Sequence, residues 1–310
     1  MIMHPYVIIA TKGRATETRM LLDTLAAQTL APALTIVVGS ESTDIAGCED
    51  HPLYANSKGE AMISPQVGLT CQRNAGIAAL KARGVMDADP QSYFCIFFDD
   101  DFRPAPDWLE KAAARFAKGD IVGLTGRVLA DGVMTGGYTE AEAAAFLNGQ
   151  KPPLTHWANQ SFESETDCAY GCNMAFLGTA IRELCFDENL PLYSWQEDRD
   201  YTGQCLRLGR VIRCPDCVGV HMGASGGRTS GLRFGYSQIA NLYYLIHKGT
   251  VPPKAGLTQA GKNFVANIVK SLFPIRRDVD YAGRLRGNMM ALMDIARGTC
   301  DPRRILGKGF

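Results

Sequence analysis

Three consecutive aspartates, Asp99-Asp100-Asp101, form the cluster in this 310-residue chain whose chemistry is easiest to state. They follow the apolar run 93–98 directly, so they stand where a buried strand is expected to end. Carboxylates packed this closely repel one another and raise each other's pKa, and a divalent cation removes that conflict. Hard oxygen ligands favour Mg²⁺ or Mn²⁺ over zinc. The triplet therefore indicates a cation site, with a solvated acidic turn as the alternative.

A second acidic pair, Glu197-Asp198, offers carboxylates suited to taking a proton from a hydroxyl. Neighbours on a helix point about 100° apart, so only one of the two can face a reacting centre. Spacings of three and four place Asp198 on one stripe with Tyr201, Cys205 and Leu208. We therefore expect Asp198 to face inward as the base and Glu197 to lie at the edge. Capping of the helix N-terminus is the alternative role for these carboxylates.

The elements that must position these residues alternate along the first part of the chain. Near-continuous apolar runs predict strands that are covered on both faces, and periods of three and four predict helices. The predicted elements in chain order are strand 6–10, helix 14–30, strand 34–38, helix 66–83, strand 93–98 and a helix from Asp107 to Gly119. This alternation is typical of an α/β fold with a mostly parallel sheet between helices, in which ligands bind beyond the carboxyl ends of the strands.

The charge of the chain is balanced in total but not in distribution. The 32 basic and 32 acidic residues sum to zero, yet residues 251–310 hold eleven Lys and Arg against four Asp and Glu, a net charge of +7. The helix-hostile run Val251-Pro252-Pro253-Lys254 marks the change. We therefore expect an acidic main domain over residues 1–250, which would hold the acidic site residues, and a basic helical extension over residues 251–310.

The basic extension shows two apolar stripes at helical spacing. One stripe comprises Phe264, Val265, Ile268 and Leu272, and the other comprises Leu285, Met289, Leu292 and Ala296. We expect a pair of packed helices whose basic residues cover the acidic domain. Peripheral attachment to an anionic membrane surface is compatible with that packing and remains open.

Composition also argues against several classes of protein and site. No apolar run approaches the roughly 20 residues of a membrane span, and residues 1–10 lack the pattern of a signal peptide. We therefore expect a cytoplasmic protein. The balanced charge argues against a nucleic-acid partner. Ten cysteines in such a chain are expected to be reduced. The run Cys214-Pro215-Asp216-Cys217 is expected to form a turn between two strands rather than part of a zinc site. Residues 131–166 are expected to form a variable connection with a short helix over 140–147.

Five segments in series resemble family 2 glycosyltransferases with the GT-A fold. They are 7–11 with Arg14, 68–76, 97–110 with its DXD triplet, 169–176, and 186–188 with the "ED" segment 195–198. Each match is weak alone, but all five follow the order of the family across roughly residues 6–245. The resemblance implies a metal-dependent transferase that moves a sugar from a nucleotide-diphosphate donor, with UDP expected, to a hydroxyl acceptor. It further implies inversion, and a place in polysaccharide or glycoconjugate synthesis with a glycan or lipid-linked acceptor, at the inner face of the membrane.

The resemblance also implies roles for individual residues. Donor contacts would come from Thr11, Arg14, Ser40, Glu41, Arg73, Asn74, Asp99, Asp100 and Arg228, the last within the glycine-rich loop 223–231. Asp101 and His221 would bind Mn²⁺ or Mg²⁺, and Asp198 would be the base. The acceptor side would comprise Gly171, Asn173, Trp195 and Glu197. The chain departs from the family after the second strand, where the usual base-reading aspartate is missing and Ser40 or Glu41 would substitute.

Three other functions fit parts of the pattern. A glycosidase needs two carboxylates flanking the scissile bond, about 5 to 10 Å apart, and has no use for a metal-binding triplet. A sugar-nucleotide pyrophosphorylase would carry a glycine-rich loop after the first strand, which is absent from 11–14. A nucleotide- or glycan-binding protein without turnover would bind the nucleotide tightly and release no sugar.

Overall fold

The computed structural model of the chain describes residues 3–133, 135–224, 230–275 and 279–310. The chain divides into two compact units. The first unit comprises Met1–Gln66, Cys71–Cys185 and Gln204–Gly227, and the second comprises Val67–Thr70, Phe186–Gly203 and Arg228–Phe310. The division into functional domains at residue 250 stays a prediction.

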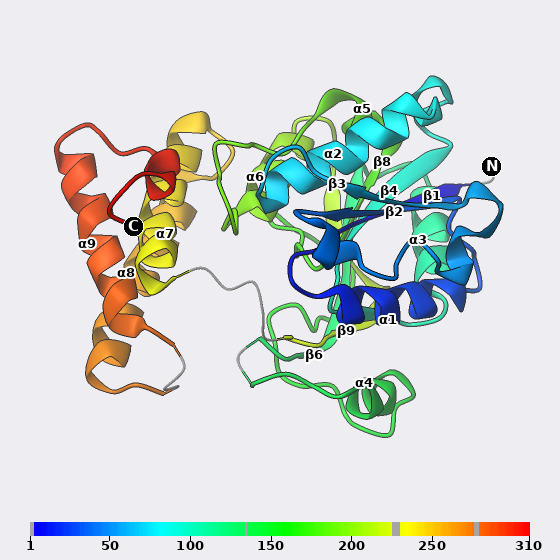
Figure 1. The fold of residues 1–310 in the computed structure, drawn as a ribbon, viewed down its shortest axis with the longest axis horizontal. Coiled ribbons are helices and arrows are strands. Elements are labelled where there is room, and N and C mark those ends of the chain that lie inside the picture. Colours follow the sequence, from blue (N-terminus) through cyan, green and yellow to red (C-terminus); the bar gives the residue numbers. More distant parts are fainter. Residues whose placement is uncertain (1–2, 134, 225–229, 276–278) are drawn as a thin grey trace. The chain divides into compact units, whose positions relative to one another are not determined.

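The first unit is built on one mixed sheet (Figure 1). Its strands are β1 His4–Ala10, β2 Leu34–Gly39, β3 Gly59–Ile63, β4 Tyr93–Asp99, β5 Phe102–Pro104, β6 Gly123–Asp131, β7 Ser164–Glu165, β8 Asn173–Leu177 and β9 Val211–His221. Their order is β3-β2-β1-β4-β8-β6-β9-β5, and β7 pairs with β9. The strands β3, β2, β1 and β4 are parallel, and β8 is antiparallel to β4. The predicted α/β fold is confirmed, with a sheet that is parallel up to β4 and mixed beyond it.

The predicted helices are present, most of them with shorter ends. The helices are α1 Ala15–Ala26, α2 Leu69–Ala82, α3 Trp108–Phe116, α4 Glu140–Leu147, α5 Gly178–Glu183, α6 Glu197–Cys205, α7 Gly231–Lys248, α8 Pro253–Leu272 and α9 Tyr281–Ala296, with 3₁₀ turns at Ser42–Ile45, Pro52–Ser57, Val85–Asp87 and Pro302–Leu306. Gly84, with φ of 73°, follows α2 in the left-handed conformation that favours glycine. The helix α4, predicted over 140–147, begins with a capping box between Thr139 and Glu142.

Alternating side chains bury both faces of the sheet. Val7 and Ile9 of β1 join a core with α1 and α3, which lie on one side of the sheet, while α2 lies on the other (Figure 1). On that second side a Cβ at Gly76 of α2 would lie 2.6 Å from Ile8, so the helix can approach β1 closely only with glycine there. These layers fix the carboxyl ends of β1, β2 and β4 at one edge, because parallel strands end on the same side.

The strand β9 brings His221 to the same edge. It pairs antiparallel with β5, and His221 stands opposite Phe102, next to the aspartate triplet. The expectation of a turn at Cys214–Cys217 is wrong, because all four residues lie within β9. Pairing with β6 jumps from Cys214 to Val218 between Gly126 and Arg127, so the strand accommodates Pro215, which has no N–H for the ladder, in a bulge.

The second unit is helical. Gly235 of α7 and Gly287 of α9 allow their helices to cross closely, since a Cβ at Gly287 would lie 2.2 Å from the Leu232 carbonyl oxygen. Between the three long helices, Asn267 donates hydrogen bonds to Gln238 and Asn288, each at 2.7 Å. No helix in the described residues is long and apolar enough to span a membrane.

The expected packing of the basic extension is partly wrong. Its two predicted helices exist as α8 and α9, but Val265, Ile268 and Leu272 of the first stripe are exposed. On α9, Met289 and Leu292 are exposed as well. The side of α8 that is buried carries Gly256 and Asn267 instead. The glycine crossing, the buried amide network and an apolar cluster of Tyr236, Ile239, Ala240, Ala291 and Ile305 hold these helices together, rather than the predicted stripes.

Candidate active site

The aspartate triplet closes β4 beside His221, the last residue of β9. The Nε2 atom of His221 lies 3.3 Å from Asp101 Oδ1 and 4.0 Å from Asp99 Oδ2. One ligand atom from each of these three residues lies within 4.8 Å of the other two. Two carboxylates and an imidazole at this spacing could hold one divalent cation.

Arg14, which follows β1, provides positive charge on another side of the triplet. Its Nε atom lies 3.2 Å from Asp100 Oδ2, and its Nη1 atom lies 3.1 Å from Asp101 Oδ2. The backbone N–H of Ala224 also donates to Asp101 Oδ2, at 2.8 Å. Arg14 thus supplies part of the compensation that a cation would otherwise supply to these carboxylates.

The surroundings set the pKa values of the triplet unevenly. Burial raises the pKa of Asp100 to about 8, although Arg14 opposes the shift, and burial also raises the pKa of Asp99. Burial acts against the ionised form of Asp101 too, but His221 and Arg14 more than offset it and lower the pKa. Burial likewise disfavours the charged form of His221, but Asp101 and Asp131 raise its pKa. A bound cation would lower the pKa of Asp99 and His221, because metal ligands must be deprotonated.

Several buried oxygens of the triplet lack a well-formed hydrogen bond within the described residues. Beyond the ion pairs already named and an interaction of Asp100 with the Thr11 hydroxyl, these oxygens are Asp100 Oδ1 and Oδ2 and Asp101 Oδ1. Asp100 and Asp101 are almost wholly buried, at 0% and 2% exposure. Buried polar atoms are nearly always paired, because leaving one unpaired costs about 1–3 kcal/mol. These oxygens therefore fit a ligand-binding role better than a structural one.

Arg73 lies beneath the triplet and orients Asp99. Its Nη2 atom donates to Asp99 Oδ1 at 3.2 Å and to the Gly171 carbonyl oxygen at 3.0 Å. Its guanidinium lies over the Phe97 ring, and the residue is 2% exposed. Arg73 is therefore placed to position Asp99 rather than to present its own charge at the surface. Asn74, next on α2, is half-buried.

Asp44 ties together the two loops that the donor contacts were expected to occupy. Its Oδ1 accepts from the Gly13 N–H at 2.6 Å, and its Oδ2 accepts from the N–H groups of Ser40 and Glu41 at 2.8 and 3.0 Å. Asp44 is fully buried, whereas the Glu41 side chain is exposed at the rim. Both carboxylate oxygens of Asp44, which follows β2, are therefore hydrogen-bonded to backbone N–H groups.

Gln72 fixes the carboxyl end of β1 through similar hydrogen bonds to the backbone. Gln72 Nε2 donates to the carbonyl oxygens of Thr11 and Val38, at 2.7 and 2.8 Å. The Thr11 hydroxyl accepts from Thr18 and is buried at 2% exposure. Thr11 therefore shapes the loop after β1 from within.

The residues expected on the acceptor side of the first unit are also internal. Asn173, the first residue of β8, is fully buried, and its Oδ1 accepts from the Thr125 hydroxyl at 2.8 Å. Gly171 contributes its carbonyl oxygen to Arg73. Both residues shape the backbone near the triplet, and their contact with an acceptor stays a prediction.

In the second unit, the segment before α6 has an unusual backbone. Leu192, Ser194 and Gln196 have φ of 60°, 53° and 74°, values that side chains other than glycine rarely adopt. Each such residue costs on the order of 1–3 kcal/mol, and such strain clusters at functional sites. Ser194 stabilises the segment by donating to the Leu190 carbonyl oxygen at 2.6 Å, and Asn241 donates to the Trp195 carbonyl oxygen at 2.8 Å.

The predicted orientation of α6 is wrong, because Glu197 lies on its buried side and Asp198 does not. Glu197 and Asp200 are buried, at 6% and 0% exposure, while Asp198 is half-buried. Tyr201 is buried as expected, and it stacks on Phe186. The buried side of α6 is therefore centred closer to Glu197 and Asp200 than the apolar residues alone indicated. A half-buried Asp198 keeps access to a substrate, so the geometry does not remove it as a base.

Lys248 forms ion pairs with two carboxylates, one before the strained segment and one after it. Lys248 Nζ lies 2.6 Å from Asp187 Oδ2 and 2.7 Å from Asp200 Oδ2. Thr250 donates to the other Asp200 oxygen at 2.6 Å, and Tyr244 donates to Asp187 at 2.9 Å. The group of Asp187, Asp200 and Lys248, called the lysine-closed pair below, anchors the chain before and after residues 192–196.

Comparison with known proteins decides the family. Residues 6–184, more than half of the chain, match the model described as glycosyl transferase family 2. The chain is a family 2 glycosyltransferase. No curated protein sequence matches it. The glycosidase and pyrophosphorylase alternatives are therefore set aside.

Solved structures show that the transferase shares its fold with other glycosyltransferases. Residues 1–349 of S. aureus TarS with UDP-GlcNAc have a TM-score of 0.57 at 15% identity, covering 97% of this chain and 82% of that one. A mannosyltransferase, PcManGT from Pyrobaculum calidifontis with GDP-Man and Mn²⁺, has a TM-score of 0.53 at 17% identity, covering 98% and 84%. Longer S. aureus TarS has a TM-score of 0.52 at 17% identity; the match covers 88% of this chain and only 44% of that chain. The GT-A fold expected from the sequence is confirmed.

The structure of the transferase thus brings together part of the predicted site. Within the first unit it assembles Arg14, Asp99, Asp100, Asp101 and His221. Arg228 lies outside the described residues. Asp44 and Gln72 were missed, although an aspartate shortly after a Gly-Ser strand end is a known pattern for bonding nearby backbone N–H groups.

Proposed function

We propose that this transferase moves a sugar from a nucleotide-diphosphate donor to a hydroxyl acceptor, with a divalent cation bound by Asp99, Asp101 and His221. The observation that carries the proposal is the gathering of two carboxylates and an imidazole within 4.8 Å, beside buried oxygens of Asp100 and Asp101 that make no hydrogen bond of normal geometry in the described part of the chain. A donor set that includes imidazole suits Mn²⁺ better than Mg²⁺, which prefers oxygen alone. The presence of Mn²⁺ with GDP-Man in PcManGT supports the same choice.

The residues at and around the end of β4 have different proposed roles in binding the donor. When bound, the cation stabilises the negative charge that gathers on the departing diphosphate. Asp99, oriented by Arg73, is placed to hold the ribose as well as the cation. Arg14, whose side chain beside Asp100 and Asp101 is 23% exposed, is proposed to pair with diphosphate oxygens through its guanidinium. UDP is the proposed nucleotide, with Ser40 or Glu41 at the nucleobase and Arg228 at the diphosphate.

We assign the base to Asp198. Its half-buried carboxylate follows the strained segment 192–196, and strain of this kind is a mark of functional sites. One carboxylate that takes the proton of the acceptor hydroxyl, in a single displacement, gives inversion. Trp195 and Glu197 are proposed for the acceptor side, with a glycan or lipid-linked acceptor of polysaccharide or glycoconjugate synthesis at the inner face of the cytoplasmic membrane.

The base assignment has a matched pair of variants. We expect Asp198→Asn to lower turnover by roughly 10²–10⁴-fold while nucleotide binding is unchanged. Glu197→Gln, one residue earlier on the same helix, is expected to lower turnover far less. A larger loss in Glu197→Gln than in Asp198→Asn would transfer the role to Glu197.

A thermal-stability screen tests the function itself. Purified protein is heated with Mn²⁺ and a panel of nucleoside diphosphates and nucleotide sugars, and release of the nucleoside diphosphate is measured in parallel. We expect a metal-dependent rise in Tm with one nucleotide family, absent from Asp101→Ala, and slow release of its diphosphate. No rise with any nucleotide would refute the proposal, and a rise without sugar release would indicate binding without turnover.

A further inference from the structure

A chain of aromatic rings leads from the proposed metal ligand to an open indole. Tyr170 contacts His221 edge-on with ring centroids 5.7 Å apart, and the Tyr170 hydroxyl lies 3.3 Å from His221 Nδ1. Trp157 follows, with its centroid 4.8 Å from that of Tyr170. Trp157 is nevertheless 50% exposed. An indole therefore lies two ring contacts from the metal cluster with half of its surface open.

This indole is held in a fixed position. The segment that carries it is hydrogen-bonded to β6 on either side of Trp157. The Leu154 N–H donates to the Leu129 carbonyl oxygen at 2.8 Å, and the Val128 N–H donates to the Ala158 carbonyl oxygen at 3.0 Å. The Arg213 guanidinium lies 5.6 Å from the centroid of the Trp157 ring. Tyr170 is anchored in turn by donating to Asp131 at 2.6 Å.

We propose that Trp157 is a stacking platform for a pyranose ring of the substrate. The C–H face of a sugar packs on the apolar face of an indole, while the hydroxyl groups of the sugar stay in water. A rigid aromatic surface loses little entropy when it binds, which suits weak and polar ligands such as sugars. This role rests on the proposed function. Either the transferred sugar or the acceptor sugar could make the contact with Trp157.

Two arms of one experiment separate these sources. In the first arm, affinities of UDP and UDP-GlcNAc with Mn²⁺ are compared in the wild type and in Trp157→Ala. In the second arm, UDP release from UDP-GlcNAc is measured in water and with a panel of mono- and disaccharides. We expect Trp157→Ala to bind UDP normally and to lose about tenfold in one arm: the added affinity of the donor sugar, or the stimulation by a saccharide.

Variants of the same segment make the test specific. Trp157→Phe keeps a flat ring and is expected to recover most of the loss, and Phe162→Ala, which removes an aromatic ring that is 62% exposed, is expected to change neither arm. Normal UDP binding with both arms unchanged in Trp157→Ala overturns the platform alone. Absence of nucleotide binding in the wild type refutes the proposed function and the platform with it.

A separate observation concerns α8, whose polarity is reversed for a helix in water. The side that packs within the second unit carries Gly256 and the hydrogen-bonded Asn267. The open side carries a row of large apolar residues, namely Leu257 at 67%, Val265 at 58%, Val269 at 51% and Leu272 at 70% exposure. A helix in a soluble protein normally turns its apolar face to the core. This face is therefore built to meet something other than water.

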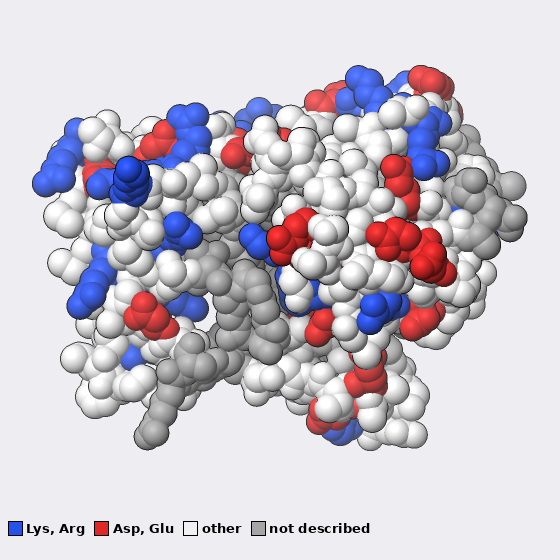
Figure 2. Space-filling view, viewed as in Figure 1, with Lys and Arg blue, Asp and Glu red and all other residues white. Residues whose placement is uncertain are grey.

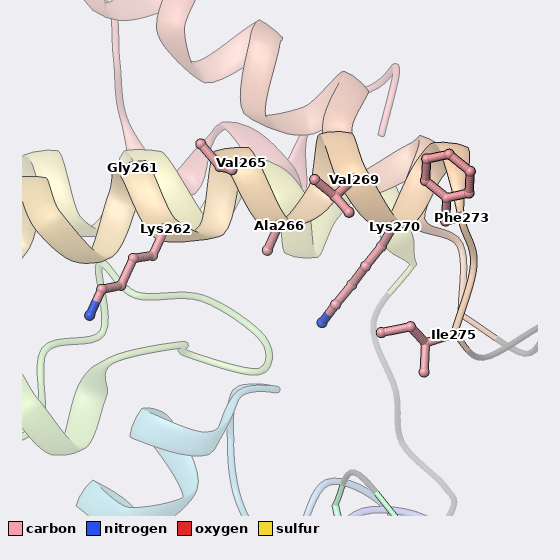
Figure 3. A pocket seen from close by; sticks show the side chains of 8 residues that line it. All are labelled: Gly261, Lys262, Val265, Ala266, Val269, Lys270, Phe273 and Ile275. Carbon is pink, nitrogen blue, oxygen red and sulfur yellow. The ribbon is translucent and has the colours of Figure 1, made fainter.

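The charges on this face select its partner. The helix α8 contains Lys254, Lys262 and Lys270 and no acidic residue. Figure 3 shows Lys262 and Lys270 extending from the same side of the helix, with Phe273 and Ile275 beyond its C-terminal end, around a hollow that they line with Val265 and Val269. Figure 2 shows basic side chains spread over the second unit, with fewer acidic ones among them. A second copy would set lysines against lysines across a two-fold contact, which is unfavourable.

We infer that the apolar face of α8 docks on an anionic lipid surface. Apolar side chains would enter the boundary of the acyl region while the lysines meet the lipid head groups, as in other amphipathic helices that lie in a membrane interface. This docking deepens the proposed location at the membrane and would bring the site to lipid-linked acceptors.

Vesicle co-sedimentation tests this docking. The full chain is mixed with phosphatidylcholine vesicles that contain either no anionic lipid or about one third phosphatidylglycerol, at low and high salt. We expect binding about thirtyfold stronger on the anionic vesicles, from roughly two lysines near the surface, and weaker binding at high salt. The double variant Val269→Glu with Leu272→Glu is expected to lose binding, while Met20→Glu, on the surface of α1 at 39% exposure, is expected to keep it.

The nucleotide response and the oligomeric state complete the design. The double variant should keep its Mn²⁺-dependent nucleotide stabilisation, which shows that the fold and the proposed function survive. Equal sedimentation with and without anionic lipid, or none, overturns the docking. A wild-type oligomer that the double variant dissociates would assign the face to a second copy instead.

Discussion

In the second unit, Asp187 and Asp200 share the ammonium group of Lys248 and receive further hydrogen bonds from Tyr244 and Thr250. In the first unit, Asp100 and Asp101 are as deeply buried, yet three of their oxygens accept no hydrogen bond of normal geometry within the described residues. The triplet has Arg14 and His221 nearby, but these cations neutralise it unevenly, as the raised pKa of Asp100 from burial and the lowered pKa of Asp101 beside His221 show.

The difference separates carboxylates that hold a fold from carboxylates that await a ligand. A buried ion pair with all its hydrogen bonds made resists removal of either partner. A buried carboxylate cluster that lacks some of its partners is stabilised by whatever supplies them, here a divalent cation and the groups that come with it. The lysine-closed pair should therefore govern stability, and the triplet should govern activity.

The largest expected effect lies in the triplet. Asp99→Asn removes a ligand whose pKa burial already raises, and its amide oxygen can still accept from the buried Arg73, so the free energy of unfolding should fall less than in the lysine variant described next. Sugar transfer should fall by about 10²–10³-fold, because stabilisation of the departing diphosphate is weakened. Turnover and urea unfolding are measured on the same preparation. Glu60→Gln, at a partly exposed ion pair with Arg83, is the control. A stability loss in Asp99→Asn as large as its activity loss would erase the distinction between the two clusters.

The second effect reverses that pattern. Lys248→Met leaves Asp187 and Asp200 buried without their shared cation, and we expect unfolding of the second unit to become easier by about 3–5 kcal/mol. Mn²⁺ affinity should stay at the wild-type value, since the proposed ligands belong to the first unit. Urea unfolding and a Mn²⁺ titration check both parts. Unchanged stability in this variant would show that the lysine-closed pair is not structural.

Acid should weaken the lysine-closed pair in a defined direction. Burial works against ionisation of Asp187, but Lys248 and the Asn189 N–H more than offset it, so its pKa in the folded state is lowered. The stability that Asp187 contributes is complete above its unfolded pKa of about 4 and is lost as pH falls through the lower folded value. The stability difference between wild type and Lys248→Met should therefore shrink as pH falls below about 5. A difference that grows on acidification would have the wrong sign.

The smallest expected effect concerns the strained segment that the lysine-closed pair anchors. Gln196 has φ of 74°, and glycine adopts this conformation without a steric penalty. We expect Gln196→Gly to raise the free energy of unfolding by up to about 1 kcal/mol while turnover falls, because the segment before Asp198 becomes freer. Calorimetry and a rate assay on this variant and on Gln196→Ala compare glycine with another small residue. Destabilisation by glycine and not by alanine would argue against strain.

The strands, the helices and the aspartate triplet could be predicted from the sequence because each leaves a local pattern. Apolar runs and periods of three and four mark β1, β2, β4 and the helices, and a run of three aspartates is visible without a fold. Contacts made across the chain leave no such signal. The proximity of His221 to Asp101, 120 residues away, depends on the pairing of β5 with β9, and the resemblance to a family supplied it in advance.

The other wrong predictions are explained by how the helices and strands pack. The orientation of α6 was predicted from apolar residues alone, but buried carboxylates that pair with Lys248 turn its Asp200 side inward. The apolar stripe of α8 was expected to pack, yet Asn267 and Gly256 occupy the interior side. The Pro215 bulge looked like a turn because a bulge and a turn use the same residues.

Manganese binding measured by electron paramagnetic resonance tests the metal assignment most directly. Free Mn²⁺ gives a six-line signal that broadens when the ion is held by a protein, so titration without nucleotide counts sites and ranks variants. We predict one site per wild-type chain, lost in Asp101→Asn and in His221→Ala and retained in Glu60→Gln. Equal binding by the wild type and Asp101→Asn, or no binding by the wild type with or without nucleoside diphosphate, would contradict it.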